Sequence, residues 1–434
     1  MTFRRLLRAP VLLALPLAFV VGACSEDLET GGACPALCPG QQLDIRDTVL
    51  LPAIVFDTTL GDFPFRGEEP WLLLASRPEL DVRSIVRFDT LARTFRPTGV
   101  DTAEVVTRVD SATFDFRIQR TELPLPETFF IDAYDVSDLT APDSIPTTLL
   151  PHFTAARLLG SVRIDSAGFV DTTLVRIQID TVKLLATIVD SAKVMRIGLQ
   201  VRSATPAQVR IFPTTGDASS RGPRLRYRVS ADTLIPPALI SASSSTPSTP
   251  LVISTFYKDY LLIAAAPDIR AAQRFSVGGL PGVRSYLRFE LPRWLTDSSA
   301  VLRARLELVQ DPITGLDDTT DVTIRAQMVL AGHDVTDLSH AVQLLAPINA
   351  FVTDSLRLAP GDSGSRFLEI NNLVTQWRTV DGARRVPNAL VLRMDNEGST
   401  AAAARFFGVS AAPELQPRLR VSYVPVTSFT FGQP

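Results

Sequence analysis

Few residues in this chain have the type and spacing needed for nucleophilic catalysis. Residues 361–364 read Gly-Asp-Ser-Gly, a setting in which a reactive serine, here Ser363, can occur. Such a serine needs a histidine base within hydrogen-bond reach, held by a buried aspartate. The chain has three histidines, His152, His333 and His340, and none lies in a segment typical of that base. The sequence therefore predicts a turn at 361–364 and no enzymatic activity.

Metal-binding patterns are weak as well. The histidines show no zinc-ligand spacing such as HxH or HExxH. One acidic segment could offer oxygen ligands to Ca²⁺, but its spacing does not follow the EF-hand pattern. We expect a solvated acidic loop there and no metal or other cofactor. The acidic residues of this segment are Asp311, Asp317, Asp318 and Asp321.

Charge and glycine patterns argue against nucleic acid and nucleotides. The formal net charge is −3, only three lysines occur, and the arginines alternate with acids instead of forming a basic block. Gly278, Gly279 and Gly282 fit a hairpin turn better than a phosphate-binding loop. We therefore expect no nucleic-acid partner and no nucleotide partner.

The N-terminus has the features of an export signal. Three arginines within the first eight residues precede a short apolar run at 10–20, which is too short to span a bilayer. The run ends in Val-Gly-Ala-Cys at 21–24, which resembles the lipobox of bacterial lipoproteins. That resemblance implies removal of residues 1–23, acylation of Cys24 and a membrane-lipid partner. An ordinary secretory signal cut near Ala23 is the alternative. Ser25, in place of an aspartate, favours the outer membrane.

The remaining cysteines, Cys34 and Cys38, lie close together after the lipobox. Outside the cytoplasm such a pair predicts a small disulfide loop, with metal binding as the alternative. Residues 24–42 are rich in Gly, Pro and acids, which is typical of a flexible tether. Removal of residues 1–23 would change the formal net charge from −3 to −6.

An internal repeat sets the domain organisation. VRSIVRFD at 82–89 is echoed by VRSYLRFE at 283–290, and PRLRYRV at 223–229 by PRLRVSY at 417–423. Between them, SATFDFRIQ at 111–119 corresponds to SAVLRARLE. The order is the same in both halves, so the pattern indicates a tandem duplication. We expect repeats at 43–230 and 250–426, a Pro/Ser/Thr linker at 231–249 and a tail at 427–434.

Two-residue alternation predicts the fold class. Around 112–118 the apolar residues Ala112, Phe114, Phe116 and Ile118 alternate with polar ones, and 300–308 behaves likewise. This alternation is typical of antiparallel strands with one buried face. We predict an all-β protein of two tandem antiparallel, jelly-roll-like β-sandwiches. Each has one short helix, at 370–377 with Asn371 as the N-cap, and ambiguously at 179–189.

The order of these segments resembles the DNRLRE-domain family of surface β-sandwiches, which is similar to certain carbohydrate-binding modules. RSYLRFEL, SAVLRARLELV, LVTQW and PRLRVSYV carry the resemblance in the second repeat, and RSIVRFD, SATFDFRI and RGPRLRYRV carry it in the first. The resemblance implies a sandwich fold. No ligand-contacting motif can be matched residue by residue.

Four residues are candidate ligand contacts. Trp294 and Tyr257 could stack on sugar rings, whereas Trp71 and Trp377 fit core positions better. Arg87 and Arg288 occupy the same place in the two repeats, and we expect cross-strand ion pairs on a wet face. The main expectation is a non-enzymatic, lipid-anchored envelope protein with a structural or adhesive role. The alternative is a surface protein that binds polysaccharide.

Overall fold

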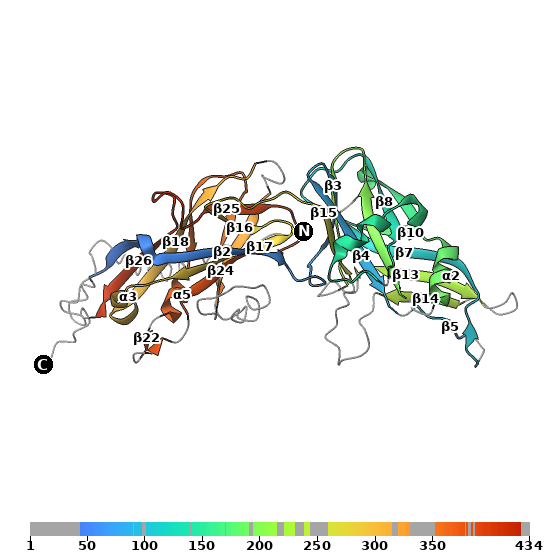
Figure 1. The fold of residues 1–434 in the computed structure, drawn as a ribbon, viewed down its shortest axis with the longest axis horizontal. Coiled ribbons are helices and arrows are strands. Elements are labelled where there is room, and N and C mark those ends of the chain that lie inside the picture. The colour runs from blue at the N-terminus through green and yellow to red at the C-terminus, as the bar shows by residue number, and fades with distance from the viewer. Residues whose placement is uncertain are drawn as a thin grey trace, which may run out of the picture.

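The computed structural model confirms an all-β, sandwich-like fold with few helices (Figure 1). It describes residues 44–426, apart from 90, 98–100, 139, 170, 191–193, 215–220, 231–237, 244–258, 315–319, 330–351, 378, 381–382 and 385–386. Within these residues the strands form two antiparallel sandwiches of two layers each. Among the helices described, none has the length and apolar character needed to span a bilayer.

The first sandwich consists of two layers joined by the β3–β4 pair. Its first layer contains β3 (Leu72–Arg77), β7 (Arg108–Arg120), β10 (Thr172–Gln178), β12 (Ala207–Ile211), β13 (Arg224–Ser230) and β14 (Ala238–Ser243). Its second layer contains β4 (Leu80–Phe88), β8 (Thr128–Asp135), β9 (Leu158–Asp165), β11 (Met195–Arg202) and β15 (Asp259–Ala265).

The second sandwich repeats this plan, with the layers joined at β16–β17. Its first layer contains β1 (Arg46–Leu50), β16 (Arg274–Gly278), β18 (Ser299–Asp311), β21 (Gly364–Glu369), β25 (Ala403–Phe407) and β26 (Arg418–Pro425). Its second layer contains β2 (Ile54–Phe63), β17 (Gly282–Phe289), β19 (Val322–Met328), β20 (Val352–Leu358) and β24 (Ala389–Met394).

The two sandwiches exchange strands with respect to chain order. β1 pairs with β26 and β2 with β17, so residues 46–63, expected in the first repeat, complete the second sandwich. β14 and β15 take the equivalent places beside β13 and β4 of the first sandwich. Residues 238–243, expected in a linker, therefore form a strand, and 259–265 belong to the first sandwich. Alternation reveals which face of a strand is buried, but it does not reveal the partner strand.

The repeated segments occupy equivalent positions in the two sandwiches. Ser84 on β4 and Ser285 on β17 are both fully buried. The Ser84 hydroxyl donates to the carbonyl oxygen of Leu73 at 3.1 Å, and the Ser285 hydroxyl donates to that of Ser276 at 2.6 Å. In each repeat the buried serine hydroxyl is thus hydrogen-bonded to a backbone carbonyl oxygen of the neighbouring strand. Buried hydroxyl groups generally need such a partner.

Short helices lie at the ends of strands. α5 forms near the predicted place, although Asn371 is its first helical residue and makes no side-chain cap. The ambiguous segment is helical, because the Asp180 carboxylate caps α2 by accepting from the amides of Val182 and Lys183. Trp294 lies in the short helix α3. The helices are α2 (Thr181–Val189), α3 (Arg293–Asp297) and α5 (Asn371–Gln376), with 3₁₀ turns η1 (Leu51–Ala53), η2 (Pro146–His152), η3 (Ala155–Arg157) and η4 (Ser166–Gly168).

Two further hairpins, β5–β6 and β22–β23, are short. They comprise β5 (Thr94–Phe95), β6 (Glu104–Val105), β22 (Thr379–Val380) and β23 (Ala383–Arg384).

Candidate functional site at the junction of the sandwiches

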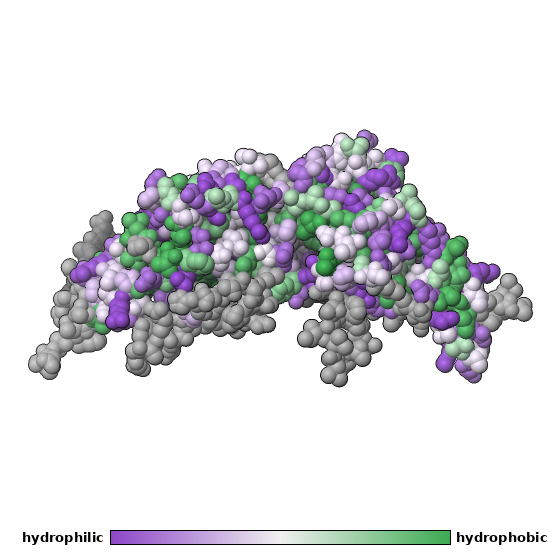
Figure 2. All heavy atoms as spheres, in the orientation of Figure 1, coloured by the Kyte–Doolittle hydropathy of each residue, from purple (hydrophilic) through white to green (hydrophobic). Residues whose placement is uncertain are grey.

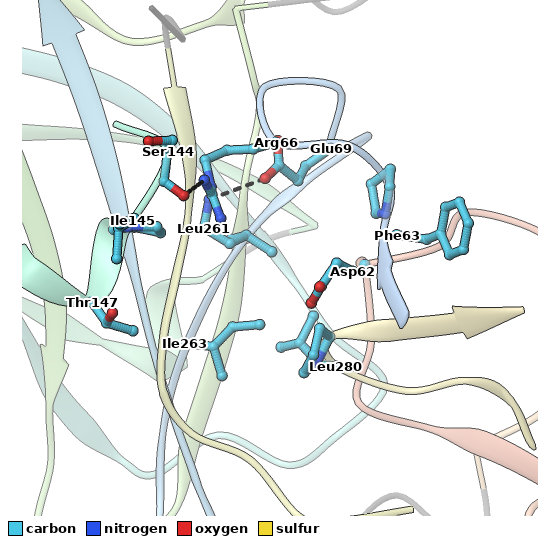
Figure 3. A pocket seen from close by; sticks show the side chains of 14 residues that line it. Asp62, Phe63, Arg66, Glu69, Ser144, Ile145, Thr147, Leu261, Ile263 and Leu280 are labelled. Atoms are coloured by element: carbon cyan, nitrogen blue, oxygen red, sulfur yellow. Dashed lines mark hydrogen bonds between the residues drawn. The ribbon is translucent and has the colours of Figure 1, made fainter. Parts of the chain in front are cut away.

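The chain passes between the sandwiches twice, at 64–71 and at 266–273. A cavity of about 380 Å³ lies beside the first of these connections. Figure 2 shows apolar side chains gathered in this region of the surface, and Figure 3 shows Asp62, Ile263 and Leu280 around the same space. The cavity is thus lined by residues of both sandwiches. Its lining residues are Asp62, Phe63, Pro64, Arg66, Glu69, Ser144, Ile145, Pro146, Thr147, Leu261, Ile263, Leu280, Pro281 and Gly398.

Glu69 is the buried titratable group in the wall of this cavity. Only 6% of the residue is exposed, and its carboxyl oxygens accept from the amides of Gly67 at 2.5 Å and Leu261 at 3.3 Å. Burial disfavours the charged form and raises the pKa of Glu69 to about 7. This side chain joins the first connection to β15.

The junction is held from both sides by polar contacts. The Arg66 guanidinium donates to the carbonyl oxygen of Asp143 at 3.0 Å and to that of Ser144 at 2.6 Å. Figure 3 shows the contact with Ser144. Across the junction, Arg210 of the first sandwich donates to the carbonyl oxygen of Ser399 at 2.9 Å. Gly398 has a φ of 77°, and a Cβ there would lie 2.7 Å from Cδ of Pro64. Only glycine allows this close approach at little cost.

A buried ionic cluster lies behind the cavity in the first sandwich. The Asp143 carboxylate is fully buried and pairs with Arg87, and it lies 3.0 Å from Nε of Arg196. The Tyr260 hydroxyl on β15 donates to it at 2.7 Å. Burial, with the nearby Asp143 charge, raises the pKa of Tyr260, so this hydroxyl remains a donor. Asp143 therefore links β4, β11 and β15.

The second sandwich has its own buried ion pair at the junction. Arg284 on β17 donates to both oxygens of Glu397, at 2.8 and 2.5 Å. The Phe63 ring at the end of β2 lies 3.8 Å from the Arg284 guanidinium carbon, a cation–π contact. The exchanged strand β2 thus covers this pair.

In the described part of the chain, the residues considered for nucleophilic catalysis form no serine–histidine–aspartate arrangement. Ser363 lies in the turn between β20 and β21, where the amide of Asp362 donates to the carbonyl oxygen of Ala359. His152 contacts Asp138 at 3.1 Å in the first sandwich, and the other two histidines lie outside the described residues. No group of three or more His, Cys, Asp or Glu that could hold a metal occurs in the part of the chain described.

The acidic segment considered as a calcium site, and expected to be a solvated loop, is engaged in ion pairs where it is described. Asp311 accepts from Arg274 at 3.0 Å and from Arg405 at 2.7 Å, and Asp321 pairs with Arg357. Asp317 and Asp318 lie outside the described residues.

The two arginine candidates differ in their surroundings. Arg87 pairs with Asp89, two residues along the chain, and with Asp143. It is buried, with 5% exposure, so the expected cross-strand pair on a wet face is not formed. The loop that carries Asp143 covers that face, which strand alternation does not reveal. Arg288 is half-buried, with its guanidinium carbon 5.7 Å from the Phe56 ring centre. Arg87 is therefore unsuited to contact a ligand in solution.

The aromatic candidates also differ. Trp294 is 38% exposed, and its ring lies 4.7 Å from that of Tyr423. Trp377 is fully buried against Phe289, as expected for a core residue. Tyr257 and all three cysteines, Cys24, Cys34 and Cys38, lie outside the described residues.

Sequence reasoning did not find Glu69 or Asp143. Asp143 lies in APDSIP, which reads as an ordinary turn, and Glu69 follows another acid before a proline. The one available signal was Arg87, an arginine between apolar residues on a strand that is otherwise buried.

Comparison with known proteins adds little. No protein-family model and no curated protein matches the chain. The chain is similar to a structure of infectious bursal disease virus, Gx strain, at 12% identity over 90% of this chain and 79% of that chain, with a TM-score of 0.14. A crystal structure of the infectious bursal disease virus VP2 subviral particle matches at 10% identity over 88% and 76%, with a TM-score of 0.13. Similarity this low carries no argument, and the resemblance to DNRLRE domains stays a prediction.

The pKa of Glu69 leads to a testable pH dependence. Between its ordinary pKa of 4.5 and about 7, the folded chain holds a proton that the unfolded chain has lost. Folding stability contributed by Glu69 is therefore highest below pH 4.5 and falls as the pH rises to 7, by on the order of 3 kcal/mol. Urea unfolding of the Glu69→Gln variant should lack this decline. Parallel pH profiles for both proteins would contradict the assignment, because any fixed cost of the amide would not change with pH.

Proposed function

We propose that this protein is a non-enzymatic, lipid-anchored protein of the bacterial cell envelope with a structural or adhesive role. The lipobox-like segment ending in Cys24 supports the anchor. The sequence alone supports export, and the fold is consistent with a surface module.

The pairing of β1 with β26 is the observation that carries the structural part of the proposal. Arg46 lies opposite Tyr423, at the end of the second sandwich that is distant from the junction (Figure 1). A tether from Cys24 would enter the protein there, so the second sandwich would lie nearest the membrane and the first farthest from it. At about 3.3–3.6 Å per residue, the segment from Cys24 to Arg46 could extend to roughly 75 Å.

The junction supports a spacer role. Two chain connections, the Arg210 contact and the close approach at Gly398 all hold the sandwiches together. Domains joined by one exposed linker generally move relative to each other. Two anchored connections restrict such motion, so an outer sandwich could be presented at a fixed distance from the tether.

The polysaccharide-binding alternative has less support. Arg87 is buried, and Tyr257 lies outside the described residues. The alternative therefore depends on Trp294, whose exposed ring packs on Tyr423, and on the half-buried Arg288.

The anchor is tested by fractionation of cells that express Cys24→Ala. We expect the unaltered chain in the membrane fraction, extracted only by detergent, because acyl chains contribute about 0.8 kcal/mol per buried CH₂. The Cys24→Ala variant should move to the soluble fraction, whereas Cys34→Ala should stay with the membrane. Cells that carry only the released variant should also lose any envelope or attachment phenotype that the anchored chain restores. Membrane retention of Cys24→Ala would rule out the anchor.

A further inference from the structure

The N-terminal arm, which we define as residues 46–63, completes a sandwich from which it is distant in sequence. The chain continues from the arm through 64–71 into the first sandwich, and the rest of the second sandwich begins only at β16. The arm therefore reaches the second sandwich as a separate segment. Its place beside β17 and β26 is formed by residues far along the chain.

The contacts that the arm makes with the second sandwich would be the same if the arm came from another chain of this protein. Within the arm, Ala53, Ile54 and Phe63 are buried, whereas Val55 and Phe56 are 39% and 45% exposed. The same geometry can form between two chains without any new interface.

Polar contacts fix the position of the arm along its groove. The Thr59 hydroxyl lies 2.9 Å from that of Ser285, and the Asp57 carboxylate accepts from the amide of Val409 at 2.6 Å. Both partners belong to the second sandwich. An arm from another chain would find the same hydrogen bonds and the same register.

Both connections between the sandwiches are hydrogen-bonded, the first to the first sandwich and the second to the second sandwich. Residues 64–71 are fixed to the first sandwich by the Glu69 and Arg66 hydrogen bonds. In 266–273, the residues Asp268, Arg270, Ala272 and Gln273 are exposed, and Ile269 is the buried one. At about 3.3–3.6 Å per residue this connection can extend to roughly 27 Å. Exchange would have to open this connection, including the hydrogen bonds that the carbonyl oxygens of Ile269 and Gln273 accept from Ser276 and Gly408.

We propose that two copies of this chain exchange their N-terminal arms. The arm of one copy completes the second sandwich of the other, and each 266–273 connection opens to span the two halves. Reciprocal exchange closes as a dimer with two-fold symmetry. The intramolecular form is favoured when chains are dilute, because the arm is tethered at a high effective concentration. Exchange becomes important when copies are concentrated during folding.

The test uses one cysteine on each side of the arm. Asp47 on β1 lies opposite Ser422 on β26, and their side chains are in contact. Asp47→Cys and Ser422→Cys are made in separate full-length chains whose native cysteines, Cys24, Cys34 and Cys38, are replaced by serine. An equimolar mixture is unfolded in urea, refolded together, oxidised and separated without reductant. A disulfide requires Cα atoms within about 7 Å, so only an exchanged arm links these two chains.

We expect a covalent heterodimer whose ratio to monomer rises in proportion to chain concentration, about 100-fold between roughly 1 and 100 µM. The single-chain variant with both cysteines should close an internal disulfide, which confirms the β1–β26 register. Ala204→Cys, on an exposed turn of the first sandwich, replaces Asp47→Cys in the control mixture. The proposal is overturned if the mixture gives no more heterodimer than this control, or if the single-chain variant fails to close.

Discussion

Removal of residues 44–63 should unfold the second sandwich and leave the first intact. The deletion takes away β1 and β2, the strands that pair with β26 and β17. Burial of Ile54 and Phe63 alone contributes about 1.5–3 kcal/mol each. Loss of Phe63 also uncovers the buried Arg284–Glu397 pair. These losses are comparable to a whole domain stability of about 5–15 kcal/mol.

Limited proteolysis with mass spectrometry measures this outcome. In the deletion variant, we expect a protected fragment close to 64–265 and rapid digestion of 274–425. Removal of residues 25–42, which precede β1, serves as the matched control and should leave both sandwiches protected. Chain order alone makes the opposite prediction, in which loss of 44–63 damages the first sandwich. Protection of the C-terminal half in the variant would therefore refute the strand exchange.

Replacement of Asp143 by alanine should destabilise the first sandwich strongly. The change leaves Arg87 and Arg196 buried beside each other without their shared carboxylate, and it removes the acceptor of Tyr260. Loss of one partner from a buried ionic group costs about 3–5 kcal/mol. For a domain of this size that corresponds to a decrease in Tm of roughly 6–20 °C.

Calorimetry should show this effect in one of two transitions. Asp81→Ala removes a half-exposed partner of Arg83 from the same sandwich, and it should cost about 0–1 kcal/mol. Asp143→Asn keeps an acceptor and should fall between the two. Equal effects of Asp143→Ala and Asp81→Ala would mean that the ionic cluster contributes little to stability. An effect of Asp143→Ala on the transition of the second sandwich would contradict the assignment of β15 to the first sandwich.

The fold class was predictable because a strand with one buried face shows alternating apolar and polar residues in its own sequence. Phe114 and Phe116 on β7 lie in the core, and Ala304, Leu306 and Leu308 on β18 do likewise. Leu302, expected on the same face, is exposed, because the strand register shifts between Val301 and Arg303. The helix at α5 was predictable from its apolar spacing, and the capping aspartate of α2 is also visible in the sequence.

The strand exchange and the junction were not predictable in this way. An alternating segment such as β2 fits any sheet edge that offers the right face, and the choice depends on residues far away. Asp143 is buried where Arg87, Arg196 and Tyr260 of three different strands converge on its carboxylate. Glu69 is buried against β15, where it accepts from the amide of Leu261. Nothing in the immediate sequence of either acid distinguishes it from a solvated turn residue.

The pairing of β1 with β26 also has a consequence for biosynthesis. Asp47 and its partner Ser422 are 375 positions apart. At synthesis rates of about 5–20 residues per second, the first strand emerges roughly 20–75 s before the last. The first sandwich can complete as soon as β15 is available, while the arm ahead of it still has unpaired backbone groups. Unpaired strand edges are prone to aggregate, so we expect this segment to need a chaperone between emergence and closure.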